Sequence, residues 1–403
     1  MVWYIASTPE QLATGVDIAS YVDEKYTSPG MGGKVPSENA IASNCRMLRN
    51  ARGLSQIEMA EKVGLSRAGY LKIESGESTP RSDTLERLAS ALGVKIAELM
   101  RAPDQLQHVR FRSKKRINSR EELLVEVKSR LDAYQALAQA LGDQRRPAAV
   151  EVPRKDMEKA AQAVRLALKR TPDEPIHDIC GLVESAGYRL LKVRLSSTFL
   201  EGEDATDRAE GFFGLSVFAE DDVPAIVVND FERISIERRI FTVAHELGHV
   251  HLHRDSYTAA ESDEREKEEL EADLFASHFL MPRARFDKEW TGAYGLPFIE
   301  RVLKVKRIFR VSYKTVLRRL QDQGDENLYP RFFGMFKKRF GRSLTKREEP
   351  SPLDESDFEA DLLPSMVRKG VEREILSQAR AAELLGVELK QFRERASEWN
   401  LTG

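Results

Sequence analysis

Two histidines and a glutamate stand at helical spacing inside an apolar stretch of the chain. His245, Glu246 and His249 form the pattern His-Glu-x-x-His, and most of their neighbours are apolar. Residues four apart lie on one face of a helix, so both imidazoles can bind the same zinc ion. Glu246 lies one position further round, from where it can act as general base on a water molecule that the metal activates. Two buried histidines without a ligand would be costly polar groups, and this favours a zinc site.

A catalytic zinc takes a third protein ligand and leaves its fourth position for water. Glu269 follows His249 by 20 residues and lies on a second predicted helix. We therefore expect Glu269 to be the third ligand. Asp273, four residues later on the same face, is expected to orient a ligand histidine through a hydrogen bond.

Other side chains near the motif leave alternatives open. Those that compete with Glu269 for the metal are Glu271 in the first place, then Glu268, Asp273 and His278. His251 and His253 are expected to cap the end of the first helix or to line the cleft. The residue that stabilises a tetrahedral oxyanion is not identified by the sequence, and the nearest candidates are Tyr257, His253 and Arg254.

Several stretches of this region resemble the ImmA/IrrE metallopeptidase family. They are Arg239–His249, Glu269–Ala276 and Leu280-Met281-Pro282, preceded by the strand-like run Ala225–Asn229, and the likeness covers roughly residues 150–285. It implies a compact, zincin-like helical domain with a small sheet. It also implies a zinc endopeptidase that cleaves a regulatory protein, typically a repressor. The family's third ligand falls on Glu269, and Asp273 stands where many members have Asn.

A second informative region lies between Ile41 and Met100, where apolar residues recur at helical spacing between short turns. Ser55 and Glu58 have the spacing of a capping box, and Ser66 holds the N-cap position of the next helix. The pattern predicts four or five short helices. Two of them, at residues 56–63 and 67–75, are joined by a turn in the layout of a helix-turn-helix.

The same region is similar to the Cro/phage-repressor (XRE) helix-turn-helix family in the stretches Leu48–Gln56 and Ile73–Arg81. The residues that this resemblance assigns to the DNA surface are Gln56, Ser66, Arg67, Ala68 and Lys72. Gln56 is expected at a phosphate, and Arg67, Ala68 and Lys72 at base edges, where Arg pairs with guanine and Ala touches a thymine methyl. Such a protein binds a double-stranded operator as a homodimer. The alternative is a helical bundle without a DNA role.

Composition is compatible with both modules. A chain of 403 residues holds two or three domains, and its formal net charge of −2 creates no overall basic field. A basic cluster between Arg110 and Arg120 is interpreted as a linker, with a phosphate-contacting arm as the alternative. Cys45 and Cys180 are expected to be buried thiols in a reducing compartment. Neither a signal peptide nor a membrane span is predicted, so we expect a cytoplasmic protein without a membrane partner.

The chain as a whole is expected to be mainly α with a small β-sheet (α+β). The predicted parts are an N-terminal extension (1–38), a five-helix helix-turn-helix domain (39–102), a basic segment with a linker helix (103–148), a zinc metallopeptidase domain (149–290) and a helical C-terminal region with a candidate second helix-turn-helix hairpin (291–403). The predicted helices are 120–141, 157–169, 175–186 and 298–320, the strands 188–195, 211–218 and 223–228, and a flexible linker is expected at 346–357.

These patterns lead to one functional hypothesis and one alternative. The hypothesis is a DNA-binding transcriptional regulator whose zinc endopeptidase domain cleaves either itself or a partner, such as a small helix-turn-helix repressor. The alternative is a non-proteolytic repressor or antitoxin in which the zinc domain has a structural or sensory role. Glu246 favours the hypothesis, because a purely structural zinc site has no use for a general base.

Overall fold

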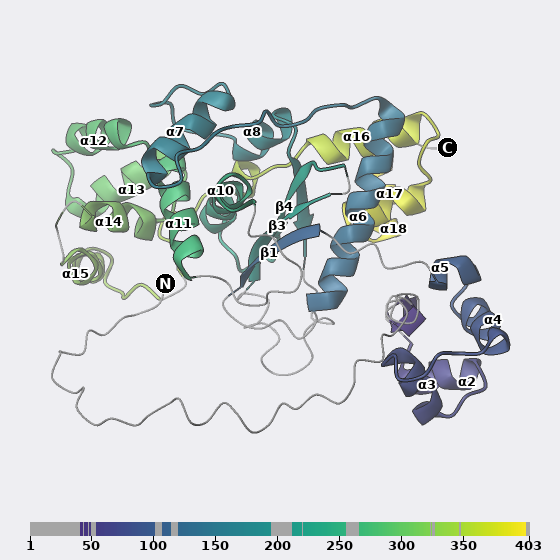
Figure 1. Cartoon of the computed structure of the whole chain (residues 1–403). Helices are drawn as coiled ribbons and strands as arrows, with labels where there is room; N and C mark the ends of the chain where they lie inside the picture. Colours follow the sequence, from purple (N-terminus) through teal and green to yellow (C-terminus); the bar gives the residue numbers. More distant parts are fainter. Residues whose placement is uncertain are drawn as a thin grey trace, which may run out of the picture. The chain divides into compact units, whose positions relative to one another are not determined.

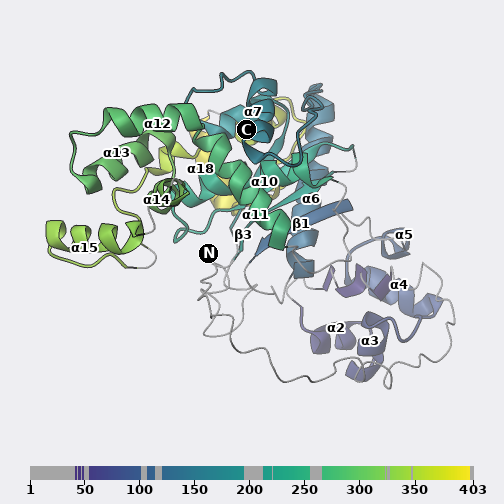
Figure 2. The ribbon, with the colours of Figure 1, turned by 60° about the vertical axis from the view of Figure 1, so that its left-hand side comes forward.

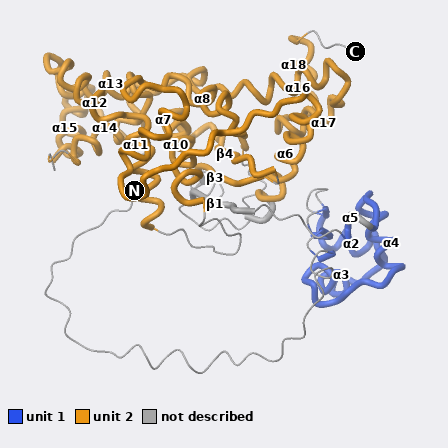
Figure 3. The backbone as a smooth tube through the Cα atoms, turned by 45° about the horizontal axis from the view of Figure 1, so that its top comes forward, with its two compact units in different colours: residues 1–103 blue, residues 104–403 orange. Residues whose placement is uncertain are grey.

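The computed structural model describes residues 41–42, 44–46, 48–49, 54–100, 107–113, 120–194, 212–219, 221–254, 266–322, 324, 327–345 and 348–399 (Figure 1). The chain divides into two compact units, residues 1–103 and 104–403 (Figure 3). Helices predominate and one small sheet is present, which confirms the predicted α+β class. The N-terminal extension, Tyr257 and the basic residues 114–116 lie outside the described residues.

Short helices around one apolar core make up the described part of the first unit. They are α2 (Gln56–Lys62), α3 (Arg67–Glu74), α4 (Ser82–Ala91) and α5 (Ile96–Met100), preceded by helical residues between 41 and 49. The capping box at Ser55 and Glu58 is present, and the Ser66 hydroxyl accepts a hydrogen bond from the Gly69 amide at the start of α3. Gly64 supplies the left-handed turn between α2 and α3, with φ of 65°.

A four-stranded sheet lies at the centre of the second unit. Its strands are β1 (Gln107–Ser113), β2 (Arg189–Val193), β3 (Phe212–Phe218) and β4 (Pro224–Asn229), in the order β1-β3-β4-β2. β2 and β4 are parallel, whereas β3 runs antiparallel to both β4 and β1. The predicted strands at 188–195, 211–218 and 223–228 are confirmed within two residues. β1 was not predicted, because the sequence was interpreted as a linker at these residues.

Both faces of the sheet are covered by helices (Figures 1 and 2). The helices of one face are α7 (Met157–Ala167), α8 (Ile179–Ser185), α10 (Ile236–Leu252) and α11 (Glu266–Leu280). The helices of the opposite face are α6 (Arg120–Leu141), α16 (Leu362–Glu372), α17 (Gln378–Leu385) and α18 (Leu389–Glu398). Successive side chains of a strand point to opposite faces of the sheet. Val228 therefore packs with the helices on the α10 side, and its neighbour Val227 packs with those on the α6 side.

Four further helices extend the core on the α10 side. They are α12 (Arg283–Gly292), α13 (Phe298–Phe309), α14 (Tyr313–Gln321) and α15 (Leu328–Phe340). The predicted helix at 298–320 is divided at Arg310, whose left-handed φ of 53° ends α13, while Ser312 caps α14. The helix predicted at 175–186 begins only at Ile179, because Asp178 is its N-cap. In the described residues, no helix is long and apolar enough to cross a membrane.

The flexible linker predicted at 346–357 is wrong for the residues that the structure describes. Glu349 is buried, and its carboxylate lies 2.9 Å from the Lys306 ammonium on α13. The same ammonium contacts Glu237 in the first turn of α10 at 2.7 Å, and Glu237 also accepts the amide of Leu353. The segment is fixed because it supplies polar groups that a buried lysine requires, namely the Glu349 carboxyl and two backbone carbonyl oxygens. A short 3₁₀ helix, η4 (Glu355–Asp357), forms the end of this segment.

Candidate metal centre

The metal-binding pattern lies on the most buried helix of the sheet's α10 side. The hydroxyl of Ser235 caps the first turn of α10, and His253 ends the helix. α10 and α11 lie side by side (Figure 2), and their approach is close at Gly248, where a Cβ would come within 2.9 Å of the Phe275 ring. A side chain at this position would therefore push the two helices apart. His245, Glu246 and His249 are almost fully buried.

His245, His249 and Glu269 bring three donor atoms to one point. The Nε2 atoms of the two histidines lie 2.9 Å apart, and the Glu269 oxygens lie 3.2 Å from Nε2 of His245 and 2.9 Å from Nε2 of His249. Tetrahedral zinc with bonds of about 2.0–2.1 Å would hold its ligand atoms roughly 3.3 Å apart. The donor set and its spacing therefore fit a zinc ion with three protein ligands after small adjustments.

The electrostatics of Glu269 also suit a ligand. Burial alone would raise the pKa of its carboxyl, but hydrogen bonds from His245 and His249 outweigh burial and hold that pKa well below its usual range. The carboxylate form is the one that binds a cation.

Each ligand histidine has a hydrogen-bond partner on its other ring nitrogen. Nδ1 of His245 lies 2.8 Å from Oδ1 of Asp273. Nδ1 of His249 lies 2.9 Å from Nδ1 of His253, and Nε2 of His253 lies 3.0 Å from Oε2 of Glu271. Glu271, the main competitor of Glu269 in the sequence, therefore contacts His253 in the structure and is not one of the three converging donors.

These contacts fix the tautomers that metal binding requires. A metal on Nε2 leaves the proton of His249 on Nδ1, which can then donate to the unprotonated Nδ1 of His253. His253 must in turn carry its proton on Nε2, where Glu271 accepts it. The result is a chain from Glu271 through His253 to His249, in which every donor meets an acceptor.

Glu246 lies on the side of α10 that faces the sheet. Its Oε2 accepts a hydrogen bond of 2.7 Å from the hydroxyl of Ser216 on β3. Gly214, two residues earlier on the same face of β3, leaves the space that α10 needs, since a Cβ there would lie 2.5 Å from the Thr242 methyl. Neither Ser216 nor Gly214 stands near the motif in the chain, so the local sequence pattern did not indicate their contacts with α10.

Other residues considered in the sequence lie apart from the three donors. His251 contacts the hydroxyl of Tyr188 at 2.7 Å, and burial lowers its pKa to about 4. His278 contacts Arg319, and Arg254 is paired with Asp222. Of the two oxyanion candidates that the structure describes, His253 is part of the hydrogen-bonded chain around the site, whereas Arg254 pairs with Asp222.

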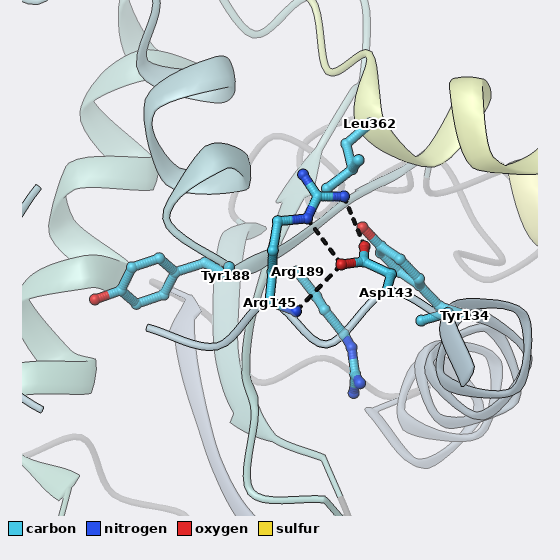
Figure 4. A pocket seen from close by; sticks show the side chains of 8 residues that line it. Tyr134, Asp143, Arg145, Tyr188, Arg189 and Leu362 are labelled. Carbon is cyan, nitrogen blue, oxygen red and sulfur yellow. Dashed lines mark hydrogen bonds and ion pairs between the residues drawn. The ribbon is translucent and has the colours of Figure 1, made fainter. Parts of the chain in front are cut away.

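A small cavity elsewhere in the second unit is not related to this centre. Its volume is about 30 Å³, and it lies where the end of α6, the start of β2 and the start of α16 meet (Figure 4). Arg145 and Asp143 form an ion pair of 2.6 Å on its wall, near Tyr134 and Leu362. A space of this size holds one or two water molecules and no peptide.

The first unit presents the residues that the sequence assigned to DNA. Arg67, Ala68 and Lys72 are exposed on α3, and Ser66 is its N-cap. Leu71, 46% exposed, lies on the same face by helical spacing, although the sequence analysis did not include it. The side-chain amide of Gln56 donates to Glu74 at 2.6 Å, so this group serves an intramolecular contact.

Comparison with known proteins finds both modules. A helix-turn-helix family model matches residues 46–99, and a model described as an IrrE N-terminal-like domain, of peptidase family M78, matches residues 214–321. A cryptic phage CTXphi transcriptional repressor, RstR of Vibrio cholerae, is 42% identical over 60 residues, which are 15% of this chain and 54% of the repressor. The chain thus spans about half the length of that relative.

Two further matches cover larger shares of shorter proteins. The uncharacterized helix-turn-helix-type regulator y4dJ of Sinorhizobium fredii is 37% identical over 65 residues, or 16% of this chain and 84% of the regulator. A crystal structure of the hypothetical transcription factor NHTF from Neisseria is 31% identical over 17% of this chain and 77% of that one. Its TM-score of 0.16 is too low to support an argument about the fold.

Proposed function

Because this chain belongs to the helix-turn-helix transcriptional regulators and also carries an IrrE N-terminal-like domain, we propose that it is a DNA-binding regulator that hydrolyses a peptide bond in a regulatory protein. The observation that carries the proposal is the convergence of the donor atoms of His245, His249 and Glu269, with Glu246 next to His245 in the chain. The substrate is either this chain itself or a partner such as a small helix-turn-helix repressor.

His245, His249 and Glu269 would hold the metal, and zinc matches their donor types. Zinc bound there would supply a Lewis acid that polarises the scissile carbonyl and makes water more acidic. Glu246 takes the proton of the attacking water and delivers it to the leaving amine. The hydrogen bond from Ser216 holds the Glu246 carboxylate in place for both transfers.

The residues behind the ligands orient the imidazoles. Asp273 fixes the ring of His245, and the chain through His253 to Glu271 fixes the ring of His249. Accepting the Nδ1 protons also makes each Nε2 atom a stronger donor to the metal.

In the first unit, α3 would enter the major groove. Its exposed Arg67, Ala68 and Lys72 would meet base edges, while Ser66 and Gln56 lie at the starts of α3 and α2, where helix-turn-helix proteins approach the phosphates. Binding of two half-sites by a homodimer would provide operator specificity.

The proposal is tested by comparing protein N-termini in cells that express the wild-type chain or Glu246→Gln. Glu246→Gln keeps the metal ligands and removes the base, so new N-termini should appear only with the wild type. If both chains bind zinc and yield the same set of N-termini, the peptidase proposal fails. The non-proteolytic regulator, with a structural or sensory zinc, would then replace it.

A further inference from the structure

The strand nearest to the proposed general base is β3. The Ser216 hydroxyl contacts the Glu246 carboxylate at 2.7 Å, and a Cβ on Gly214 would lie 3.7 Å from Cγ of Glu246. The side chain of Glu246 therefore lies against the segment 214–216 of this strand. A peptide bond that reacts at Glu246 must come close to the same segment.

One edge of β3 is paired with β4, and the opposite edge is paired with β1 (Figure 1). In the antiparallel β1–β3 register, Arg110 is opposite Ser216 and Arg112 is opposite Gly214. β1 thus occupies the edge beside the two residues of β3 that adjoin Glu246. In this part of the second unit, the edge is filled by the chain's own backbone.

A sheet edge of this kind is a general binding site for extended peptides. The main-chain N–H and C=O groups of an edge strand pair with an added strand, and the pairing is largely independent of the added sequence. A peptidase that cleaves a protein segment must bind the main chain of that segment, since the scissile bond is part of the main chain. β3 is the strand whose outer edge lies next to the base.

The pairing of β1 with β3 is interrupted. Its register shifts between Gln107 and Val109 and again between Arg112 and Ser113, which leaves Val109–Arg112 as the continuous stretch. Among the described residues, β1 is also one of the two edge strands of the sheet and pairs with β3 alone. A register shift leaves a residue unpaired and disrupts the ladder locally, so β1 is the strand of this sheet that a substrate segment can replace.

We propose that the outer edge of β3 is the peptide-binding edge of the metal centre, and that β1 is its intramolecular occupant. An extended segment of the substrate must displace β1 before it reaches Glu246. This inference rests on the proposed peptidase function. It adds that β1 keeps the peptide-binding edge occupied until a substrate displaces it. Since the helix-turn-helix unit ends at Pro103 and β1 begins at Gln107, the occupant is directly joined to the DNA-binding unit.

Proline substitutions in β1 test the inference without any need for cleavage. In an antiparallel pair, successive residues direct their N–H groups alternately toward the partner and away from it. Of Arg110→Pro and Phe111→Pro, one therefore removes an N–H that faces β3, and the other removes one that faces outward. Arg110→Thr and Phe111→Val keep both N–H groups and serve as matched controls.

The probe is a fluorescent peptide with the sequence of residues 106–114, and all variants carry Glu246→Gln so that it stays intact. We expect one of the two proline variants to bind the peptide about ten-fold more tightly than Glu246→Gln alone, because its own β1 is released. The other proline variant and both controls should bind it as Glu246→Gln alone does. Equal peptide binding by all five chains would overturn the inference.

Amide hydrogen exchange of the unmodified chain and of the responsive proline variant gives a second measurement. The outward amides of residues 214–218 should be protected by β1, lose protection in the responsive proline variant and regain it with excess peptide. Exchange of these amides at an unprotected rate in the unmodified chain would contradict occupancy. Both readouts are independent of catalysis, so they can fail while new N-termini still appear in cells, or hold in a chain that cleaves nothing.

Discussion

Ser216 on β3 donates a hydrogen bond of 2.7 Å to Oε2 of Glu246 on α10, and both residues are fully buried. This contact joins the sheet to the helix that carries the metal ligands. Ser216→Ala removes a donor to a buried carboxylate, and we expect a loss of about 1–3 kcal/mol in the free energy of unfolding. Zinc content should not change, because the variant keeps all three proposed ligands.

Urea unfolding of Ser216→Ala is compared with Ser185→Ala, which loses a hydroxyl bonded to a backbone carbonyl at the end of α8. The Ser185 variant should lose less, since its acceptor is neutral. If Ser216→Ala loses no more unfolding free energy than Ser185→Ala, the hydrogen bond to the Glu246 carboxylate is no stronger than one to a neutral acceptor.

The two histidines of α10 that are two residues apart should respond differently to replacement. His249→Ala removes one of three donors, so the bound zinc should be lost. His251→Ala removes a side chain that contacts Tyr188 instead, and one zinc per chain should remain. Metal analysis after dialysis checks both; retention of zinc in His249→Ala, or its loss in His251→Ala, would disprove the assigned ligand set.

The chain from Glu271 through His253 should influence metal affinity without any contact to the metal. Glu271→Gln weakens the acceptor for His253, and His253→Ala removes the acceptor for His249. Each is expected to lower zinc affinity by about 10- to 100-fold. Competition with a chelator measures it, with the exposed Glu266→Gln on the same helix as control; affinities equal to the control would show that the chain does not support the ligand.

Stability should depend on pH through Glu349. Burial raises the pKa of this carboxyl to about 7 from its ordinary 4.5, although Lys306 acts in the opposite direction. Folding therefore favours the protonated form, so its contribution is full below pH 4.5 and is lost as the pH rises through 7. Glu349→Gln has no titrating carboxyl at this position, so its stability does not show this loss.

The stability of Glu349→Gln relative to wild type should therefore rise by up to about 3 kcal/mol between pH 4.5 and pH 8. Denaturant unfolding at both pH values measures the change. The exposed Glu359→Gln should follow the wild type at both. Parallel pH profiles for the two variants would rule out Glu349 as the titrating group.

On the DNA side, Arg67→Ala should weaken binding by about 1–3 kcal/mol and relax the sequence preference at one position, as expected for a bidentate contact to guanine. Fluorescence anisotropy with a DNA fragment selected from random sequences by the wild-type protein provides the measurement. Lys95→Ala, in the turn before α5, is the control within the same unit. Unchanged affinity and preference in Arg67→Ala would remove this residue from the reading surface.

Local spacing was enough to propose the helices of both modules and the residues on their faces. His245 and His249 meet because they are one helical turn apart, and Ser55 meets Glu58 for a similar reason. Such pairs depend on the period of a helix, which the chain carries in any context. The choice of Glu269 over Glu271 needed the family resemblance, because spacing alone left both open.

Contacts between distant segments were decided by the tertiary structure. Ser216 reaches Glu246, Glu271 turns to His253, β1 pairs with β3, and Lys306 draws the segment around Glu349 into the core. In each case the partners belong to different elements, and their meeting depends on how helices and strands pack. The sequence alone determined which chemistry the chain can carry, since helical period and residue type are local. Packing decided which groups complete the site and which strand lies at its edge, because buried polar groups take the partners that the fold brings within reach.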